Sequence, residues 1–127
     1  MMFDVTPAAP RPVPVAPARE RDILDLLAQR YTRVGSSGAH RYAFAEHVPN
    51  RPGFADRIAN FVAVDCYLTR DGGWRQPAHY EVHGHEVKVS RTDWLAELRR
   101  PEKAQAFTPF MDHWWLVVSD SKIVRAG

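Results

Sequence analysis

The stretch that most constrains the fold of this chain runs from Ile58 to Leu68. Nearly every residue in it is apolar, and only Asn60 and Asp65 interrupt it. A near-continuous apolar run of this kind is typical of a central strand that is buried on both faces of a sheet. Asp65 stands out, because carboxylates are rarely buried unless they are paired or bound to a metal. The run therefore predicts a central sheet flanked by helices, with a candidate functional residue in its middle strand.

Two further strands are predicted around this one. Residues 42–48 alternate large and small side chains, as a strand with two different faces does. Residues 79–89 follow the turn signal Asp71-Gly72-Gly73, so they should return as an antiparallel hairpin partner of the apolar strand. Residues two apart in a strand point to the same face, so Glu86 and Lys88 are expected to project together.

Helices are predicted on either side of these three strands. The first begins at about Arg19, and its apolar residues fall at helical spacing: Ile23, Leu24, Leu27 and Tyr31. A second follows Ser90-Arg91-Thr92-Asp93, which fits a capping box with Ser90 as the N-cap. Pro101 restarts a helix that Pro109 kinks or ends early, and residues 114–118 form a last buried strand. The fold class is thus α/β, with a mixed, largely antiparallel central sheet.

Length, charge and cysteine content limit the number of domains, the kinds of partner and the location that are expected. The 127 residues suit one domain over residues 19–127, preceded by a Pro/Ala-rich arm over residues 1–18 that is expected to be disordered. A net charge of +2 and a pI near 8.9 permit a polyanionic partner without demanding one. No apolar run approaches the roughly 18 residues of a membrane span, so no membrane partner is expected. Cys66 is the only cysteine, so no intrachain disulfide forms, and a cytoplasmic location is expected.

An acid on one strand beside Glu86-Val87-Lys88 on the next is suited to holding a metal against a phosphate. Mg²⁺ prefers hard oxygen ligands, which Asp65, Glu86 and the Val87 backbone carbonyl would supply. Lys88 would orient the attacking water or neutralise charge that develops on the phosphate. The alternative is a solvated Glu-Lys pair on an amphipathic strand, since Glu-x-Lys is common by chance. Asp65 and Glu86 are each expected to be needed for cleavage of a phosphodiester.

A longer motif carries a resemblance to a known family. The run from His85 to Leu95, followed by residues 101–104 and 111–119, is similar to small phage and actinobacterial proteins of the PD-(D/E)XK nuclease superfamily. It is more distantly similar to DNA-repair proteins of the MmcB type. The resemblance covers residues 19–120 approximately and is strongest over residues 83–119. It implies the restriction-endonuclease-like fold, with an αβββαβ core.

The resemblance also implies an activity and a set of site residues. Asp65, Glu86 and Lys88 fall on the elements that carry the superfamily's catalytic residues. Many members have a further Glu on the first helix, for which Glu20 is the candidate and Glu46 a competitor. The implied activity is Mg²⁺- or Mn²⁺-dependent cleavage of DNA, in repair or DNA metabolism of a bacterial cell or a phage-infected host. Homodimers are frequent in this superfamily.

Substrate contacts and two other functions complete the expectations. Ser90, Arg91 and Lys103 are candidate nucleic-acid contacts near the site, although Ser90 is first of all an N-cap. One alternative function is a catalytically inactive nucleic-acid-binding module that keeps the nuclease fold. The other is a zinc protein, because His83 and His85 share a strand face with His79.

Overall fold

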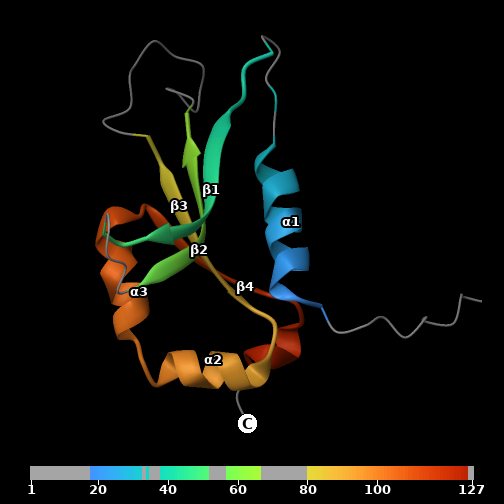
Figure 1. Ribbon diagram of the computed structural model, residues 1–127, viewed down its shortest axis with the longest axis vertical. Helices are drawn as coiled ribbons and strands as arrows, with labels where there is room; N and C mark the ends of the chain where they lie inside the picture. Colours follow the sequence, from blue (N-terminus) through green and yellow to red (C-terminus); the bar gives the residue numbers. More distant parts are fainter. Residues whose placement is uncertain (1–17, 33, 35–37, 52–56, 67–79, 126–127) are drawn as a thin grey trace, which may run out of the picture.

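A computed structural model describes residues 18–32, 34, 38–51, 57–66 and 80–125 (Figure 1). Almost all of the Pro/Ala-rich arm, His79 and the Asp71-Gly72-Gly73 turn lie outside the described residues. The elements follow in this order: α1 (Glu20–Tyr31), β1 (Tyr42–Pro49), β2 (Ile58–Asp65), β3 (Val82–Lys88), α2 (Arg91–Leu98), α3 (Glu102–Phe107) and β4 (His113–Val118). Short 3-10 turns at Thr108–Phe110 and Ser121–Ile123 flank β4.

The four strands form one mixed sheet in the order β1-β2-β3-β4. The pairs β1–β2 and β2–β3 are antiparallel, whereas β3 and β4 run parallel, with α2 and α3 in the crossover between them. The predicted mixed, largely antiparallel α/β sheet is confirmed. Pro109 does end α3 early, because the chain continues as a 3-10 turn from Thr108.

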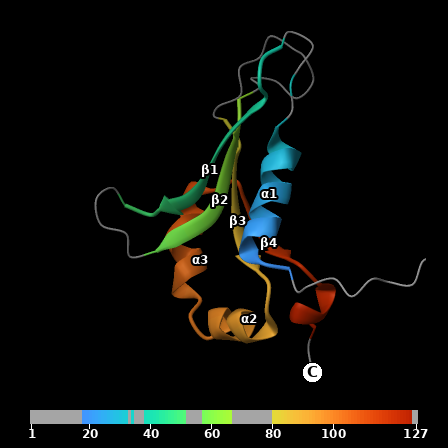
Figure 2. The same ribbon diagram turned by 45° about the vertical axis from the view of Figure 1, so that its right-hand side comes forward.

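One face of the sheet packs against α1, and this contact forms the main core. The apolar positions of α1 recur every three or four residues, so they form one stripe that faces the sheet. The core residues are Ile23, Leu24, Leu27, Tyr31, Phe61, Ala63 and Val87. Figure 2 shows α1 along this face and α3 on the opposite side of the sheet. The two sides of β3 therefore meet different surroundings, and Glu86 and Lys88 lie on the side away from the core stripe.

Close packing at Gly84 brings α3 against the second face. A Cβ at Gly84 would lie 2.5 Å from Cε3 of Trp114 in β4, so no other residue fits without a shift. The Trp114 ring stacks on Phe107 of α3, with 5.6 Å between the ring centroids. Glycine at this position thus leaves room for the Trp114 ring on this face of the sheet, where the ring stacks on Phe107 of α3.

A buried histidine ties α1 to the sheet. The Tyr31 hydroxyl lies 2.8 Å from Nε2 of His85, and Nδ1 of His85 lies 3.2 Å from the Phe61 carbonyl oxygen. A carbonyl only accepts, so Nδ1 carries the proton and Nε2 accepts from Tyr31. Burial lowers the pKa of His85 to about 4. Both ring nitrogens of His85, a histidine named for the alternative zinc site, therefore have hydrogen-bond partners inside the fold.

This histidine predicts a loss of stability in mild acid. Between pH values of about 4 and 6.5 the unfolded chain protonates His85 and the folded chain does not, so the free energy of unfolding falls as the pH drops. The expected loss is on the order of 2–3 kcal/mol. Urea unfolding at pH 7 and pH 4.5 measures it. The His85→Phe variant is the control, and an equal pH dependence in both proteins would contradict the assignment.

Candidate functional site

The strands β2 and β3 separate at one end of the sheet, and Asn60 fills the split. Their pairing ends at Phe61 and His85, although both strands continue. The Asn60 side-chain oxygen accepts from the backbone N–H of Val87 at 2.8 Å, in place of a strand partner. Its Nδ2 donates to Oε1 of Glu20 at 2.6 Å. One buried amide therefore holds the start of α1, β2 and β3 at a common point.

Glu86 lies beside this split and is 2 % exposed. Its Oε1 accepts from Nζ of Lys103 in α3 at 2.7 Å and lies 3.2 Å from Nζ of Lys88. Its Oε2 is buried and has no hydrogen-bond partner among the described residues. A buried charged oxygen without a partner costs free energy, so its presence calls for a functional explanation.

Lys88 is held between two carboxylates. Its Nζ lies 3.2 Å from Glu86 and 3.1 Å from Oε2 of Glu97 on α2. Burial alone would lower the pKa of Lys88, but the hydrogen bond with Glu97 and the charges on both carboxylates raise it above its ordinary value. Lys88 is therefore a cation and not a base, a distinction that the sequence does not provide.

A cleft of about 400 Å³ opens next to these lysines. Cations predominate in its lining, which consists of Arg57, Lys88, Asp93, Ala96, Glu97, Arg99, Arg100 and Lys103. A cleft with this excess of positive charge attracts polyanions and can follow a run of phosphates.

The structure does not bring Asp65 to this site, so the expected grouping of Asp65 with Glu86 and Lys88 is wrong. Because Phe61 pairs with His85, Asp65 stands level with Glu81, five positions (81 to 86) from Glu86 and about 17 Å away along the strand. An odd separation also turns the two side chains to opposite faces. Asp65 pairs instead with Arg41, whose Nη2 lies 2.9 Å from Oδ2.

Glu20 and Glu46, the two candidates for a further carboxylate ligand, lie in different surroundings. Glu20 reaches the site through Asn60, as described above. Glu46 does not, because it stands opposite Phe61 on the core face of β1 and forms an ion pair with Arg21 of α1. Asn60 was missed as a site residue. The available signal was its position as the other polar interruption of the apolar run.

The three candidate nucleic-acid contacts, Ser90, Arg91 and Lys103, also have different surroundings in the structure. Ser90 is the N-cap of α2, since its Oγ accepts from the Asp93 N–H at 3.2 Å, as predicted. Arg91 turns to the C-terminal segment, where Nη1 donates to the Ile123 carbonyl at 3.2 Å and to the carbonyls of Lys122 and Arg125. The guanidinium of Arg91 is therefore engaged in closing that segment. Of these three candidates, only Lys103 lines the cleft and contacts Glu86.

Comparisons of the chain with protein-family models, with curated proteins and with solved structures found no match. Within the described ranges, no helix is both long and apolar enough to cross a membrane.

Proposed function

We propose that this chain is a metal-dependent DNA nuclease of the restriction-endonuclease-like kind, and that it acts in phage or bacterial DNA repair or metabolism. The observation that carries the proposal is the buried Oε2 of Glu86, which has no partner in the described part of the chain and lies next to Lys88 and Lys103, where both border the basic cleft. The element order, with one helix before three strands and helices before the fourth, is consistent with that fold.

The oxygen donors around the strand split are of the kind that a hard divalent cation prefers. Glu86 would offer its Oε2, which has no hydrogen-bond partner among the described residues, Glu20 a second carboxylate, and Val87 its backbone carbonyl. This all-oxygen set suits Mg²⁺ or Mn²⁺. When bound, such a cation would supply the Lewis acidity that a phosphodiester needs for attack by water.

The chain's own groups would bind and orient the phosphate. Lys88 and Lys103 share one oxygen of Glu86 in the present arrangement, and either ammonium can turn to a phosphate oxygen without leaving the cleft lining. Because Lys88 is cationic, it would neutralise charge that develops on the phosphate and would not take a proton from water. The arginines of the cleft would hold flanking phosphates and so fix the register of the strand.

A second function has one specific observation in its favour. Asn60, a neutral amide, occupies the point on β2 where a carboxylate would complete the metal ligands, and Glu86 already forms ion pairs with both lysines. A catalytically inactive module that binds DNA without cutting it would tolerate such a site. Binding to DNA that needs no divalent ion and yields no products would favour this alternative.

Cleavage assays test the first function against the second. The purified chain is incubated with labelled single- and double-stranded DNA in Mg²⁺, Mn²⁺ or EDTA. We expect cleavage that requires metal and falls about 100-fold or more in Lys88→Ala, because a cation that lies between Glu86 and Glu97 and borders the cleft is lost. Lys122→Ala, an exposed lysine outside the cleft, is the matched control. Undiminished cleavage by Lys88→Ala would remove Lys88 from the mechanism.

A further inference from the structure

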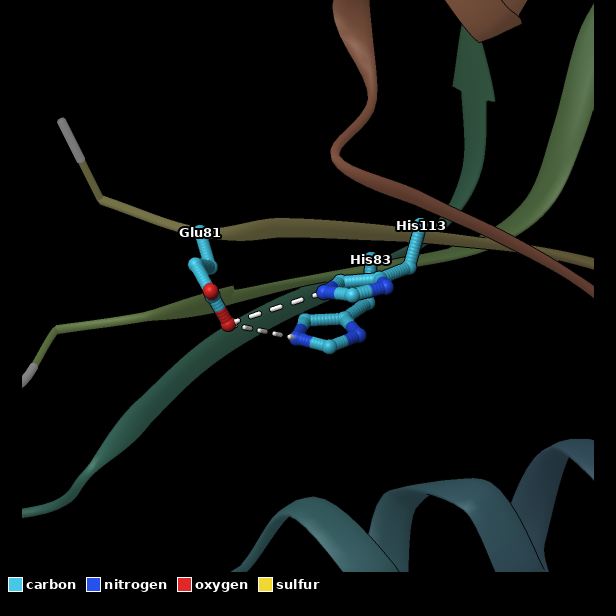
Figure 3. A group of neighbouring side chains, drawn as sticks. All are labelled: Glu81, His83 and His113. Carbon is cyan, nitrogen blue, oxygen red and sulfur yellow. Dashed lines mark ion pairs between the residues drawn. The ribbon is translucent and has the colours of Figure 1, made fainter. Parts of the chain in front are cut away.

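Three potential metal ligands converge at the other end of β3, away from Glu86 (Figure 3). Glu81 precedes β3, His83 lies in β3, and His113 begins β4. The parallel register places His83 directly beside His113, and Glu81 shares their face because it lies two residues before His83. Oε2 of Glu81 is 3.8 Å from Nε2 of His83 and 3.6 Å from Nε2 of His113.

We propose that Glu81, His83 and His113 form a binding site for a transition-metal ion of the Zn²⁺ type, separate from the site at Glu86. In a tetrahedral zinc site with bonds near 2.0–2.2 Å, neighbouring ligand atoms lie about 3.3–3.6 Å apart. The two separations from Glu81 exceed this range by at most a few tenths of an ångström, and all three ligand atoms lie within 4.8 Å of one another. Two imidazoles and one carboxylate also leave a fourth position for water, and all three side chains are half-buried.

The nature of the ligands separates this site from the first one. Imidazole nitrogen is a poor ligand for Mg²⁺ and a good one for Zn²⁺, Ni²⁺, Co²⁺ or Cu²⁺. The all-oxygen set at Glu86 has the opposite preference. One strand thus carries two sites of different chemistry at its two ends, and each can be tested without the other.

Two features must change when the metal enters. The imidazoles of His83 and His113 are stacked, with 4.4 Å between centroids and 15° between planes, and they must fan apart because a ligand nitrogen points its lone pair in the ring plane. In addition, Nε1 of Trp115 donates to Nδ1 of His83 at 3.1 Å. An indole N–H only donates, so Nδ1 is unprotonated and the proton of neutral His83 lies on Nε2.

Trp115 is therefore a competitor of the metal. For Nε2 to bind, its proton must leave to solvent, and Nδ1 must take one up from solvent, which breaks the hydrogen bond from Trp115. The indole has room to move, since Trp115 is 48 % exposed. Removal of the indole N–H should consequently tighten metal binding, whereas removal of a ligand should weaken it.

Zinc titration of the full chain tests the site, with calorimetry for stoichiometry and tryptophan fluorescence for the movement of Trp115. We expect one Zn²⁺ per chain, and a loss of affinity of more than about 100-fold in His113→Ala. Trp115→Phe should bind Zn²⁺ about two- to tenfold more tightly, because one hydrogen bond no longer competes.

Two control variants complete the experiment. His40→Ala removes an exposed histidine that is outside the triad, and Glu86→Gln disables the first site; both should bind Zn²⁺ as the parent does. Absence of saturable Zn²⁺ binding, or equal binding by His113→Ala with native circular dichroism, would overturn the proposal. Failure of the nuclease function would leave these results unchanged, since no residue of the triad belongs to the site at Glu86.

Discussion

Glu86→Gln is expected to reduce metal-dependent DNA cleavage by about 100-fold or more. The amide keeps the shape of the side chain and removes the negative charge that would hold the cation. Folding should survive, because the change relieves a buried charged oxygen that has no partner among the described residues. The measurements are single-turnover cleavage in Mg²⁺ and in Mn²⁺, which should fall by this factor, and the thermal shift that each ion produces, which should disappear.

Two other carboxylates serve as controls for this result. Glu46→Gln alters an acid that is paired with Arg21 on the opposite face, so cleavage should remain at the parent rate. Asp65→Asn should lower stability, because Asp65 is 7 % exposed and paired with Arg41, and should leave cleavage by the folded protein intact. Loss of cleavage in Asp65→Asn with full activity in Glu86→Gln would show that the site lies at the other end of the sheet.

Asn60→Asp is expected to make the stability of the chain depend on a divalent cation. The new carboxylate would lose the donor that now reaches Oε1 of Glu20 at 2.6 Å and would place like charges in contact. Without metal, the free energy of unfolding should fall by about 2 kcal/mol. With Mg²⁺ or Mn²⁺ it should recover, because a third hard oxygen ligand strengthens the cation site.

Thermal unfolding in EDTA and at increasing Mg²⁺ concentrations measures this effect without reference to activity. Asn50→Asp is the matched control, since the side-chain oxygen of Asn50 also accepts from a backbone N–H, that of Arg57, away from any carboxylate named for the site. A loss of stability in Asn60→Asp that no divalent ion restores would count against a cation at the strand split.

Local patterns in the sequence were enough to predict the elements and the faces of β3. The apolar run that begins at Ile58, the N-cap at Ser90 and the alternation around Glu86 each depend on neighbours in the chain. The structure bears these out, with β2 over Ile58–Asp65; residues 67 and 68 of the run lie outside the described residues. Whether Asp65 or Asn60 lies beside Glu86 depends instead on the register of β2 against β3. Residues 67–79 join these strands, and a connection of that length does not fix a register.

The cluster of Glu81, His83 and His113 could not be predicted from the sequence, for a similar reason. His83 and His113 meet because β3 and β4 pair in parallel across a crossover that contains two helices. Nothing in the local sequence around His113 indicates which residue of β3 it will face. The strand pattern alone suggested His85 as the partner of His83, and a buried hydrogen bond with Tyr31 occupies that ring.

The pairing of lysines with carboxylates around Asn60 has a consequence for the order in which ligands bind. Glu86 and Glu97 pair with Lys88 and Lys103, so the formal charges of these four groups cancel before any ligand arrives. A divalent cation that enters alone would leave an excess of positive charge, which a DNA phosphate would offset. Thermodynamic linkage then requires that DNA tighten the binding of the cation by the same factor as the cation tightens the binding of DNA. A nuclease built in this way would hold its metal weakly until a substrate is present.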